Sequence, residues 1–342
     1  MKKFLTAILS VLLLMATLLT VGCGGGSGDK DKNTLNLYVP DGAPALSVAR
    51  LLHDRSIVED VNVNVVNANT IQTYVTGEEQ KADFAILPVN VAVKLLASKD
   101  DYKLLGTVTN GNLFLMKQDG EVDITKNNLD ALIGKTVGVI NLANVPGLTF
   151  KAILNDADIE YVDISETGNV QADKVNLVGL TNGTAVVPNS DCEYFVVPEP
   201  AATTKQNATN GKISIAGSLQ ALYGDGSGYP QAVLVAKTTV IENNKETVDK
   251  LVNSLEGNKI WISNGVTSAD TIVSSVISGF VDKDMSPTFT ANNLNLTVIN
   301  NCAIGFTPAS ECKGAVKTYI NKLNAISNNA WGVAREEFFY IG

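Results

Sequence analysis

Two stretches of the sequence share one pattern of residue types: DFAILPVNVA at residues 83–92 and EYFVVPEPAA at residues 193–202. Each begins with an acidic residue, an aromatic residue and three apolar residues, and each continues with a proline, two variable residues and small or apolar residues. A short apolar run is typical of a buried strand, and the residues after the proline are typical of a helix start. The repeat therefore predicts two copies of one strand-to-helix unit, and with them two similar lobes.

Strands and helices alternate around each copy. The pattern predicts strands at residues 35–39, 61–66, 83–87 and 136–140, and helices at residues 89–97 and 148–155. Apolar strands that alternate with helices through short links favour parallel pairing and right-handed crossovers. The predicted fold class is therefore α/β, with each lobe a mainly parallel sheet flanked by helices.

Two apolar segments, residues 107–117 and 228–237, are entered through glycine and polar residues, and they follow the first and second copies of the repeat. If one segment carries the chain out of a lobe and the other brings it back, they form a two-segment hinge that permits closure around a ligand. We therefore expect a first lobe of residues 34–112 and 233–342, and a second lobe of residues 113–232.

The N-terminus predicts export. Lys2 and Lys3 precede an apolar run from Phe4 to Leu19, and the run ends in small residues around Cys23. This order is typical of an export signal, whereas a spanning helix needs roughly 20 apolar residues and polar flanks.

The residues before Cys23 resemble the lipobox of bacterial lipoproteins, with Thr20 where that pattern usually has leucine. The resemblance implies a lipoprotein signal peptide at residues 1–22, lipidation of Cys23 and a flexible glycine-rich tether at residues 23–33. The alternative is a signal peptide with an incidental cysteine.

Loss of the signal peptide removes two of the 26 basic residues and none of the 35 acidic ones, which leaves a formal charge of −11. Such a chain repels nucleic acid and lacks a basic membrane-binding face. Membrane attachment is therefore expected through the lipid on Cys23.

Three cysteines remain besides Cys23. Cys302 and Cys312 flank a short predicted loop, residues 303–311, which makes them a disulfide candidate in an oxidising location. Cys192 is interpreted as a small buried hydrophobic residue, because no basic residue adjoins it to lower its pKa. His53 is the single histidine of the chain, so the sequence supplies at most one histidine ligand for a metal site. We expect no metal and no cofactor.

Four segments resemble solute-binding lipoproteins of ABC importers: GAPAL at 42–46, ADFAILP at 82–88, GKTVGV at 134–139 and VPEPA at 197–201. The similar group takes up nitrate, sulfonate, taurine and thiamine precursors, and the likeness spans most of residues 34–260. It implies the two-lobed type II periplasmic-binding-protein fold. It also implies a monomeric, non-enzymatic receptor at the outer face of the cytoplasmic membrane, or on the periplasmic side in a Gram-negative cell, which delivers a small polar molecule to an ABC transporter permease.

In such folds ligands bind beyond the carboxyl ends of the strands, where helix N-termini meet. The candidate ligand-binding residues are Asp41, Gly42, Ala43, Asn67, Asn69, Thr70, Pro88, Val89, Asn90, Thr109, Asn110, Asn112, Asn141, Asn144, Val145 and Glu199. Several have a structural alternative: Asp41, Asn69 and Asn144 are equally suited to cap a helix, and Glu199 to stabilise its own helix start.

The positions of the arginines narrow the class of ligand that the cleft can bind. None of Arg50, Arg55 and Arg335 lies in a predicted cleft loop. Bidentate recognition of a carboxylate is therefore disfavoured. A small neutral or amine-bearing solute suits the cleft best, while an anion held by helix N-termini stays an alternative. Tyr38 and Tyr229 are candidates for stacking on the ligand.

Two other functions fit the same fold. A sensor would report ligand occupancy to a partner protein without transport. An enzyme would use Cys192 as nucleophile with Glu199 or Glu193 as base, but the cation that activates such a thiol is missing.

Overall fold

A computed structural model describes residues 34–77 and 80–342, and within them it has two six-stranded sheets flanked by helices. The predicted signal peptide and the lipidation site at Cys23 lie outside the described residues.

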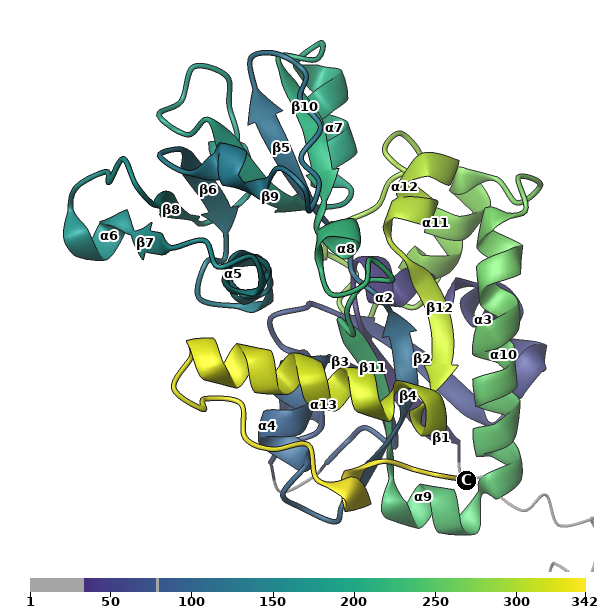
Figure 1. Cartoon of the computed structure of the whole chain (residues 1–342). Helices are drawn as coiled ribbons and strands as arrows, with labels where there is room; N and C mark the ends of the chain where they lie inside the picture. Colours follow the sequence, from purple (N-terminus) through teal and green to yellow (C-terminus); the bar gives the residue numbers. More distant parts are fainter. Residues whose placement is uncertain (1–33, 78–79) are drawn as a thin grey trace, which may run out of the picture. The chain divides into compact units, whose positions relative to one another are not determined.

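The first sheet lies in the first lobe (Figure 1). Its strands, in spatial order, are β12 (Ile304–Pro308), β4 (Tyr102–Thr109), β11 (Ala232–Lys237), β3 (Phe84–Pro88), β1 (Leu35–Pro40) and β2 (Val61–Val66). β1 pairs in parallel with both β2 and β3, whereas β11 runs antiparallel to β3 and β4. β12 comes from the far end of the chain and completes the edge beside β4.

Strands β1 and β2 form because apolar and polar residues alternate along them. Leu37, Val39, Val63 and Val65 are buried, and the asparagines and the tyrosine between such residues are half-buried. Because successive side chains of a strand point to opposite faces, this pattern commits one face to the core.

The second sheet repeats this order in the second lobe. Its strands are β10 (Ile213–Ser218), β5 (Leu113–Gln118), β9 (Tyr194–Pro198), β6 (Thr136–Ile140), β8 (Val175–Leu180) and β7 (Tyr161–Asp163). The order β2-β1-β3-β11 of the first sheet corresponds to β8-β6-β9-β5 here, and in both sheets the last strand is antiparallel. The two-lobed α/β prediction is confirmed, and both sheets are mixed because the two crossing segments supply antiparallel strands.

Helices cover both faces of each sheet. Those of the first lobe are α2 (Ala43–Leu46), α3 (Ala49–His53), α4 (Val89–Leu96), α9 (Thr238–Asn243), α10 (Lys245–Ser263), α11 (Ala269–Ser278), α12 (Leu296–Asn301) and α13 (Ala309–Ile326). Those of the second lobe are α5 (Val145–Asp156), α6 (Ile164–Thr167), α7 (Ala201–Ala208) and α8 (Leu219–Leu222). Short 3₁₀ turns are η1 (Arg55–Val58), η2 (Ile71–Tyr74), η3 (Leu129–Leu132), η4 (Gly183–Ala185) and η5 (Glu336–Phe338).

Apolar side chains sort these helices onto the two faces of each sheet. Helices α3, α10, α11 and α12 share a core with one face of the first sheet, and α4 and α13 pack on the opposite face. In the second lobe α5 and α8 pack on one face and α7 on the other.

The chain crosses between the sheets twice, at residues 110–112 and 223–231. The two crossings are bonded to each other, since the Tyr229 amide donates to the Asn110 carbonyl at 3.2 Å and the Gln231 amide donates to the Thr109 carbonyl at 3.0 Å. This is the paired arrangement that a two-segment hinge requires.

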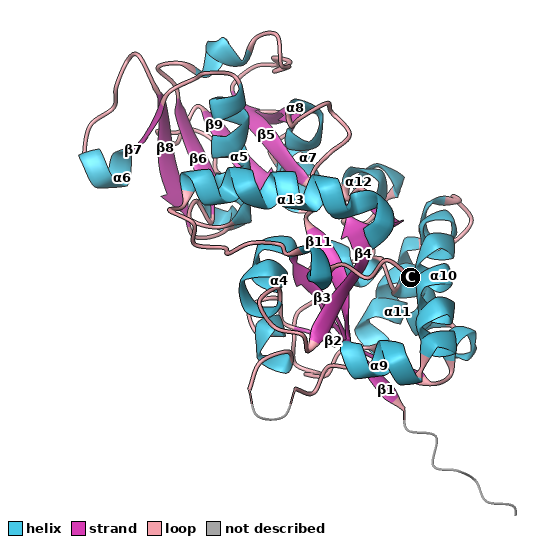
Figure 2. Ribbon diagram, turned by 60° about the horizontal axis from the view of Figure 1, so that its bottom comes forward, coloured by secondary structure: helices cyan, strands magenta, loops and turns pink. Residues whose placement is uncertain are grey.

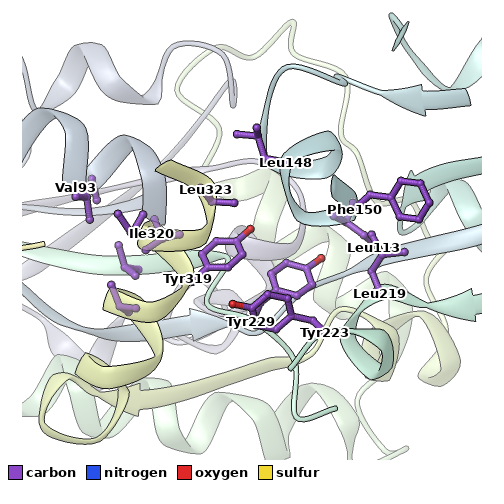
Figure 3. Packing of buried hydrophobic residues seen from close by; sticks show 14 of the residues in the cluster. Val93, Leu113, Leu148, Phe150, Leu219, Tyr223, Tyr229, Tyr319, Ile320 and Leu323 are labelled. Carbon is purple, nitrogen blue, oxygen red and sulfur yellow. The ribbon is translucent and has the colours of Figure 1, made fainter. Parts of the chain in front are cut away.

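Helix α13 belongs to the first lobe but also packs against α5 of the second (Figure 2). Its Tyr319 lies in a cluster with Tyr223 and Tyr229, stacked on Tyr229 with a ring-centroid distance of 5.5 Å (Figure 3). The Tyr319 hydroxyl is 2.6 Å from Thr149 Oγ1 on α5. Tyr229, a candidate for ligand stacking, is 1% exposed and is part of the core instead.

The predicted disulfide between Cys302 and Cys312 is wrong, because both residues are free buried thiols. Cys302 directly follows α12 as its C-cap and Cys312 lies in the first turn of α13, with strand β12 between them. Five extended residues span roughly 15 Å, whereas the Cα atoms of a disulfide lie within about 7 Å. The predicted loop between the cysteines is instead a strand at the edge of the first sheet.

The described cysteines are therefore expected to behave as unreactive thiols. Burial raises the pKa of Cys192 and of Cys312, and the pKa of Cys302 is raised by burial and by the nearby Glu199 carboxylate. Because the thiolate is the reactive species, a thiol reagent should modify these residues only after denaturation. The measurement is thiol titration before and after unfolding without reductant, together with the thermal midpoint with and without reductant. A midpoint that falls on reduction would contradict the free-thiol assignment.

Candidate functional site

A cavity of about 690 Å³ lies between the two lobes, which is large enough for a small molecule. Its walls come from the carboxyl ends of strands in both sheets and from both crossing segments. The lining residues are Asp41, Gly42, Ala43, Pro44, Ala68, Asn69, Gln72, Pro88, Asn90, Val91, Lys94, Leu95, Asn112, Leu113, Asn141, Asn144, Val145, Pro146, Pro198, Glu199, Gln231, Ala232, Thr288 and Trp331. We refer to this cavity as the cleft.

Two turns shape the opposing walls. After β1, Gly42 adopts a φ of 104°, a conformation that residues with a side chain rarely reach, and the chain then enters α2. After β6, Asn141 adopts a left-handed φ of 57°, and its carbonyl accepts from the Asn144 amide at 2.9 Å. Because asparagine tolerates this conformation, the chain can turn sharply into α5 and place Val145 at the cleft.

The base of the cleft is formed where the two chain crossings meet. The Gln231 side-chain Nε2 donates to Asn112 Oδ1 at 2.8 Å, and the Asn112 carbonyl accepts from the Glu199 amide at 2.9 Å. The Gln231 carbonyl accepts from the Val89 amide at the start of α4. One small network therefore joins both crossings to the helix starts of both lobes.

Glu199 is a buried carboxylate, 3% exposed, at the end of β9. Its oxygens accept from the Thr203 amide at 3.1 Å, from the Thr203 hydroxyl at 2.6 Å and from Asn301 Nδ2 at 2.7 Å. Asn301 ends α12 of the first lobe, so this last bond links the two lobes directly. A buried carboxylate needs such donors, because an unpaired buried charge is strongly destabilising.

Asn90 is the most buried polar side chain of the cleft, with 2% exposure, and its Oδ1 has no hydrogen-bond partner among the described residues. Gln231 Oε1 is likewise buried without a partner. Buried polar groups in folded proteins are nearly always hydrogen-bonded, so two unpaired oxygens in the wall of one cavity lack partners that the described residues do not supply.

The charged residues of the described lining are Asp41, Lys94 and Glu199. Asp41 Oδ2 accepts from the Thr288 amide at 2.7 Å. The Lys94 ammonium lies 5.2 Å from the Trp331 ring centroid, a cation–π distance. The cleft thus combines two carboxylates, one cation and a majority of uncharged polar and apolar groups.

The cleft contains eleven of the sixteen candidate ligand-binding residues and leaves out Asn67, Thr70, Val89, Thr109 and Asn110. Asn67 Oδ1 accepts from the Asn69 amide at 2.9 Å, and the Thr70 hydroxyl donates to the Asn67 carbonyl, so both stabilise a turn. The Val89 and Thr109 side chains are fully buried, and Asn110 bonds through its backbone to Tyr229 and Ala303. These five residues therefore lie outside the cleft lining.

Sequence reasoning missed the other thirteen residues of the lining, among them Lys94, Gln231, Thr288 and Trp331. Gln231 lies in the return crossing, and Lys94 follows Asn90 by four residues on one face of α4. Both could have been predicted from the sequence by including the polar residues of the crossings and the residues on the same helix face as the candidates. Thr288 and Trp331 come from the C-terminal part of the chain, where no local pattern points to the cleft.

Cys192 lies away from the cleft lining, in the apolar cluster beneath α7. Glu193, its proposed base, forms an ion pair with Lys135 at 2.9 Å. Glu199 is already occupied by its three donors. The residues of the enzyme alternative are therefore not arranged as a nucleophile and its base.

In the described part of the chain, no helix is both long and apolar enough to cross a membrane. In residues 34–77 and 80–342 no group of three or more histidine, cysteine, aspartate or glutamate side chains is placed to hold a metal ion.

No protein-family model matches the sequence, and no curated protein matches it. Solved structures do match. An ABC transporter protein from Parabacteroides distasonis is similar over 90% of this chain and 99% of its own, with a TM-score of 0.68 and 18% identity. The periplasmic aliphatic sulphonate binding protein SsuA from Escherichia coli covers 90% of this chain and 92% of its own, with a TM-score of 0.61 and 10% identity. The zinc-bound ligand-binding component of an ABC-type import system from Staphylococcus aureus covers 90% and 96%, with a TM-score of 0.55 and 11% identity. The chain therefore has the two-lobed α/β fold of the periplasmic binding proteins of ABC transporters.

Proposed function

We propose that this protein is an extracytoplasmic solute-binding lipoprotein that captures a small polar molecule between its lobes and delivers it to an ABC importer. The observation that carries the proposal is the pair of buried, unpartnered amide oxygens, on Asn90 and Gln231, in the wall of a cavity between two lobes. A ligand that supplies the missing hydrogen bonds is favoured there. The paired crossing of the chain gives the lobes a hinge about which to close.

The fold of the structural neighbours and the N-terminal sequence support the other parts of this proposal. Anchoring rests on the predicted signal peptide and on lipidation of Cys23, which would hold the acidic protein at the outer face of the cytoplasmic membrane, next to the permease. Release of the bound solute requires no covalent chemistry. The protein would then bind the solute, close its lobes around it and dock on the permease.

A bound solute is expected to stabilise the folded protein. At a free concentration of 100 times Kd, the free energy of unfolding should rise by about 2.7 kcal/mol, because the ligand binds only the folded state. The measurement is a thermal-shift screen of the purified full-length chain against sulfonates, pyrimidines, amines and oxyanions. If no solute gives a saturable shift, the proposed function is wrong.

Two tryptophan variants test whether the solute binds in the cleft. Asn144→Trp puts a bulky ring at the exposed rim of the cleft and should abolish the shift. Ala143→Trp puts the same ring at the neighbouring exposed position, which does not line the cleft, and should leave the shift intact. Equal loss in both variants, or in neither, would place binding elsewhere.

A further inference from the structure

Three side-chain amides, those of Asn90, Asn112 and Gln231, line the cleft near its base. They come from three separate parts of the chain: the first turn of α4, the outgoing crossing and the return crossing. The Gln231 backbone carbonyl accepts from the Val89 amide at 3.0 Å, which places Gln231 against the residue that precedes Asn90. Asn90 therefore follows a residue whose backbone is bonded to Gln231, and Asn112 is joined to Gln231 by a bond between their side chains.

The hydrogen bond between Gln231 and Asn112 leaves unused groups at both ends of the pair. Gln231 Nε2 donates to Asn112 Oδ1 at 2.8 Å, while Gln231 Oε1 has no partner and the Asn112 amino group has no acceptor among the described residues. Turning both amides over exchanges their roles but still leaves one carbonyl oxygen and one amino group free. In either orientation the pair offers one acceptor and one donor.

Asn90 adds a third amide to this pair. Its side chain is 2% exposed, and its Oδ1 is unpartnered. An amide presents a carbonyl acceptor and an amino donor in one plane, so Asn90 has the same double capacity as the pair. The polar base of the cleft is thus matched to a ligand that both donates and accepts.

The charges around these amides disfavour an anion. The described lining contains two carboxylates, Asp41 and Glu199, and a single cation, Lys94, which lies over the Trp331 ring. It contains no arginine, the residue whose planar fork matches carboxylate and sulfonate oxygens. An anion would also meet the buried Glu199 charge, and like charges disfavour each other.

We propose that the cleft selects an uncharged solute whose polar edge carries both an N–H donor and a carbonyl acceptor, as in a carboxamide, a urea or a cyclic imide. This inference rests on the proposed function and adds the class of substrate. Complementary donors and acceptors would pair the buried oxygens of Asn90 and Gln231. A carboxylate or sulfonate of the same size offers acceptors only and leaves both oxygens unpaired.

The test is calorimetric titration of the purified full-length chain with neutral and anionic partners of matched shape: propionamide against propionate, nicotinamide against nicotinate, and benzamide against benzoate. At least one neutral member should bind, and it should bind at least about 10-fold more tightly than its anionic counterpart, because each unpaired buried oxygen weakens binding. Tighter binding of an anion, or binding of no neutral member, would overturn this inference. If this inference fails but the wider solute screen gives a saturable thermal shift, the proposed function still stands. If the screen also gives no saturable shift, both the inference and the proposed function are wrong.

A matched pair of variants tests the role of Asn90 with whichever neutral probe binds. Asn90 and Asn258 are both buried helical asparagines of the first lobe, with 2% and 1% exposure. Unlike Asn90, Asn258 is fully engaged, accepting from the Arg50 amide and donating to the Leu46 carbonyl, each at 2.9 Å.

The two leucine substitutions should separate binding from stability. Asn90→Leu should leave the thermal midpoint of the unliganded protein unchanged or higher and weaken probe binding at least about 10-fold, since it removes an unpaired polar group that the ligand needs. Asn258→Leu should lower the midpoint and leave the dissociation constant of the probe unchanged. Full affinity in Asn90→Leu would show that the Asn90 side chain does not contribute to binding of the solute.

Discussion

Replacing Gly147 with alanine is expected to destabilise the protein by about 3 kcal/mol or more, because a single added carbon has no room. Gly147 lies in the first turn of α5, and a Cβ atom there would be 1.9 Å from the Leu142 carbonyl oxygen and 2.5 Å from its carbonyl carbon. These are backbone atoms of the turn after β6, so no side-chain rotation can relieve the overlap. Helix α5 would have to move, and with it Val145 and Pro146 in the cleft wall.

The matched control is Gly314→Ala on α13, where a Cβ would meet no atom within 4 Å. This substitution should raise stability by about 0.5–1 kcal/mol, because alanine loses less conformational entropy than glycine in a helix. The measurement is urea-induced unfolding of both variants beside the parent chain. Comparable stability of the two variants would show that α5 can move away from Leu142 at little cost.

Replacing Tyr319 with alanine is expected to cost about 3–5 kcal/mol, the usual loss when a large aromatic side chain is removed from a core. Tyr319 is 0% exposed and contacts both Tyr223 and Tyr229, with centroid distances of 5.6 and 5.5 Å. Its hydroxyl bond to Thr149 joins α13 of the first lobe to α5 of the second. The substitution therefore removes packing inside the cluster and a tie between the lobes.

Tyr319→Phe separates these two contributions. It keeps the ring contacts and removes the hydroxyl, so its cost should be only about 1 kcal/mol. The coupling between Tyr319→Phe and Thr149→Val, measured by urea unfolding in a double-mutant cycle, isolates the hydrogen bond. If alanine and phenylalanine at position 319 cost the same, ring packing contributes nothing and the hydroxyl bond accounts for the whole effect.

The strands that build each lobe could be predicted from the sequence because their signals are local. Apolar alternation predicted β1 at residues 35–39 and β2 at residues 61–66, and the structure places them at Leu35–Pro40 and Val61–Val66. The repeated acid–aromatic–apolar–proline pattern predicted β3 and β9, which occupy the same place in the two sheets. Such patterns depend on the two-residue period of a strand and on proline, not on distant contacts.

The error at Cys302 and Cys312 has the opposite cause. Local spacing suggested a loop closed by a disulfide, but pairing with β4 extends the intervening residues into β12. Pairing between strands nearly 200 residues apart is a tertiary event, and nothing in the nine residues between the cysteines indicates it. The same holds for Thr288 and Trp331, which reach the cleft only because the C-terminal part of the chain packs back on the first lobe.

The sequence by itself determined the two α/β lobes, the two crossing segments and most of the asparagines of the cleft, because each is marked by short-range periodicity or by residues at strand ends. Tertiary structure alone decided which polar groups stay unpaired. Glu199 and Asn258 find partners 102 and 208 residues away, in Asn301 and Arg50. In contrast, Asn90 Oδ1 and Gln231 Oε1 have no hydrogen-bond partner among the described residues. A hydrogen bond depends on distance and direction in space, so the capacity of the cleft to bind a ligand exists only once the chain is folded.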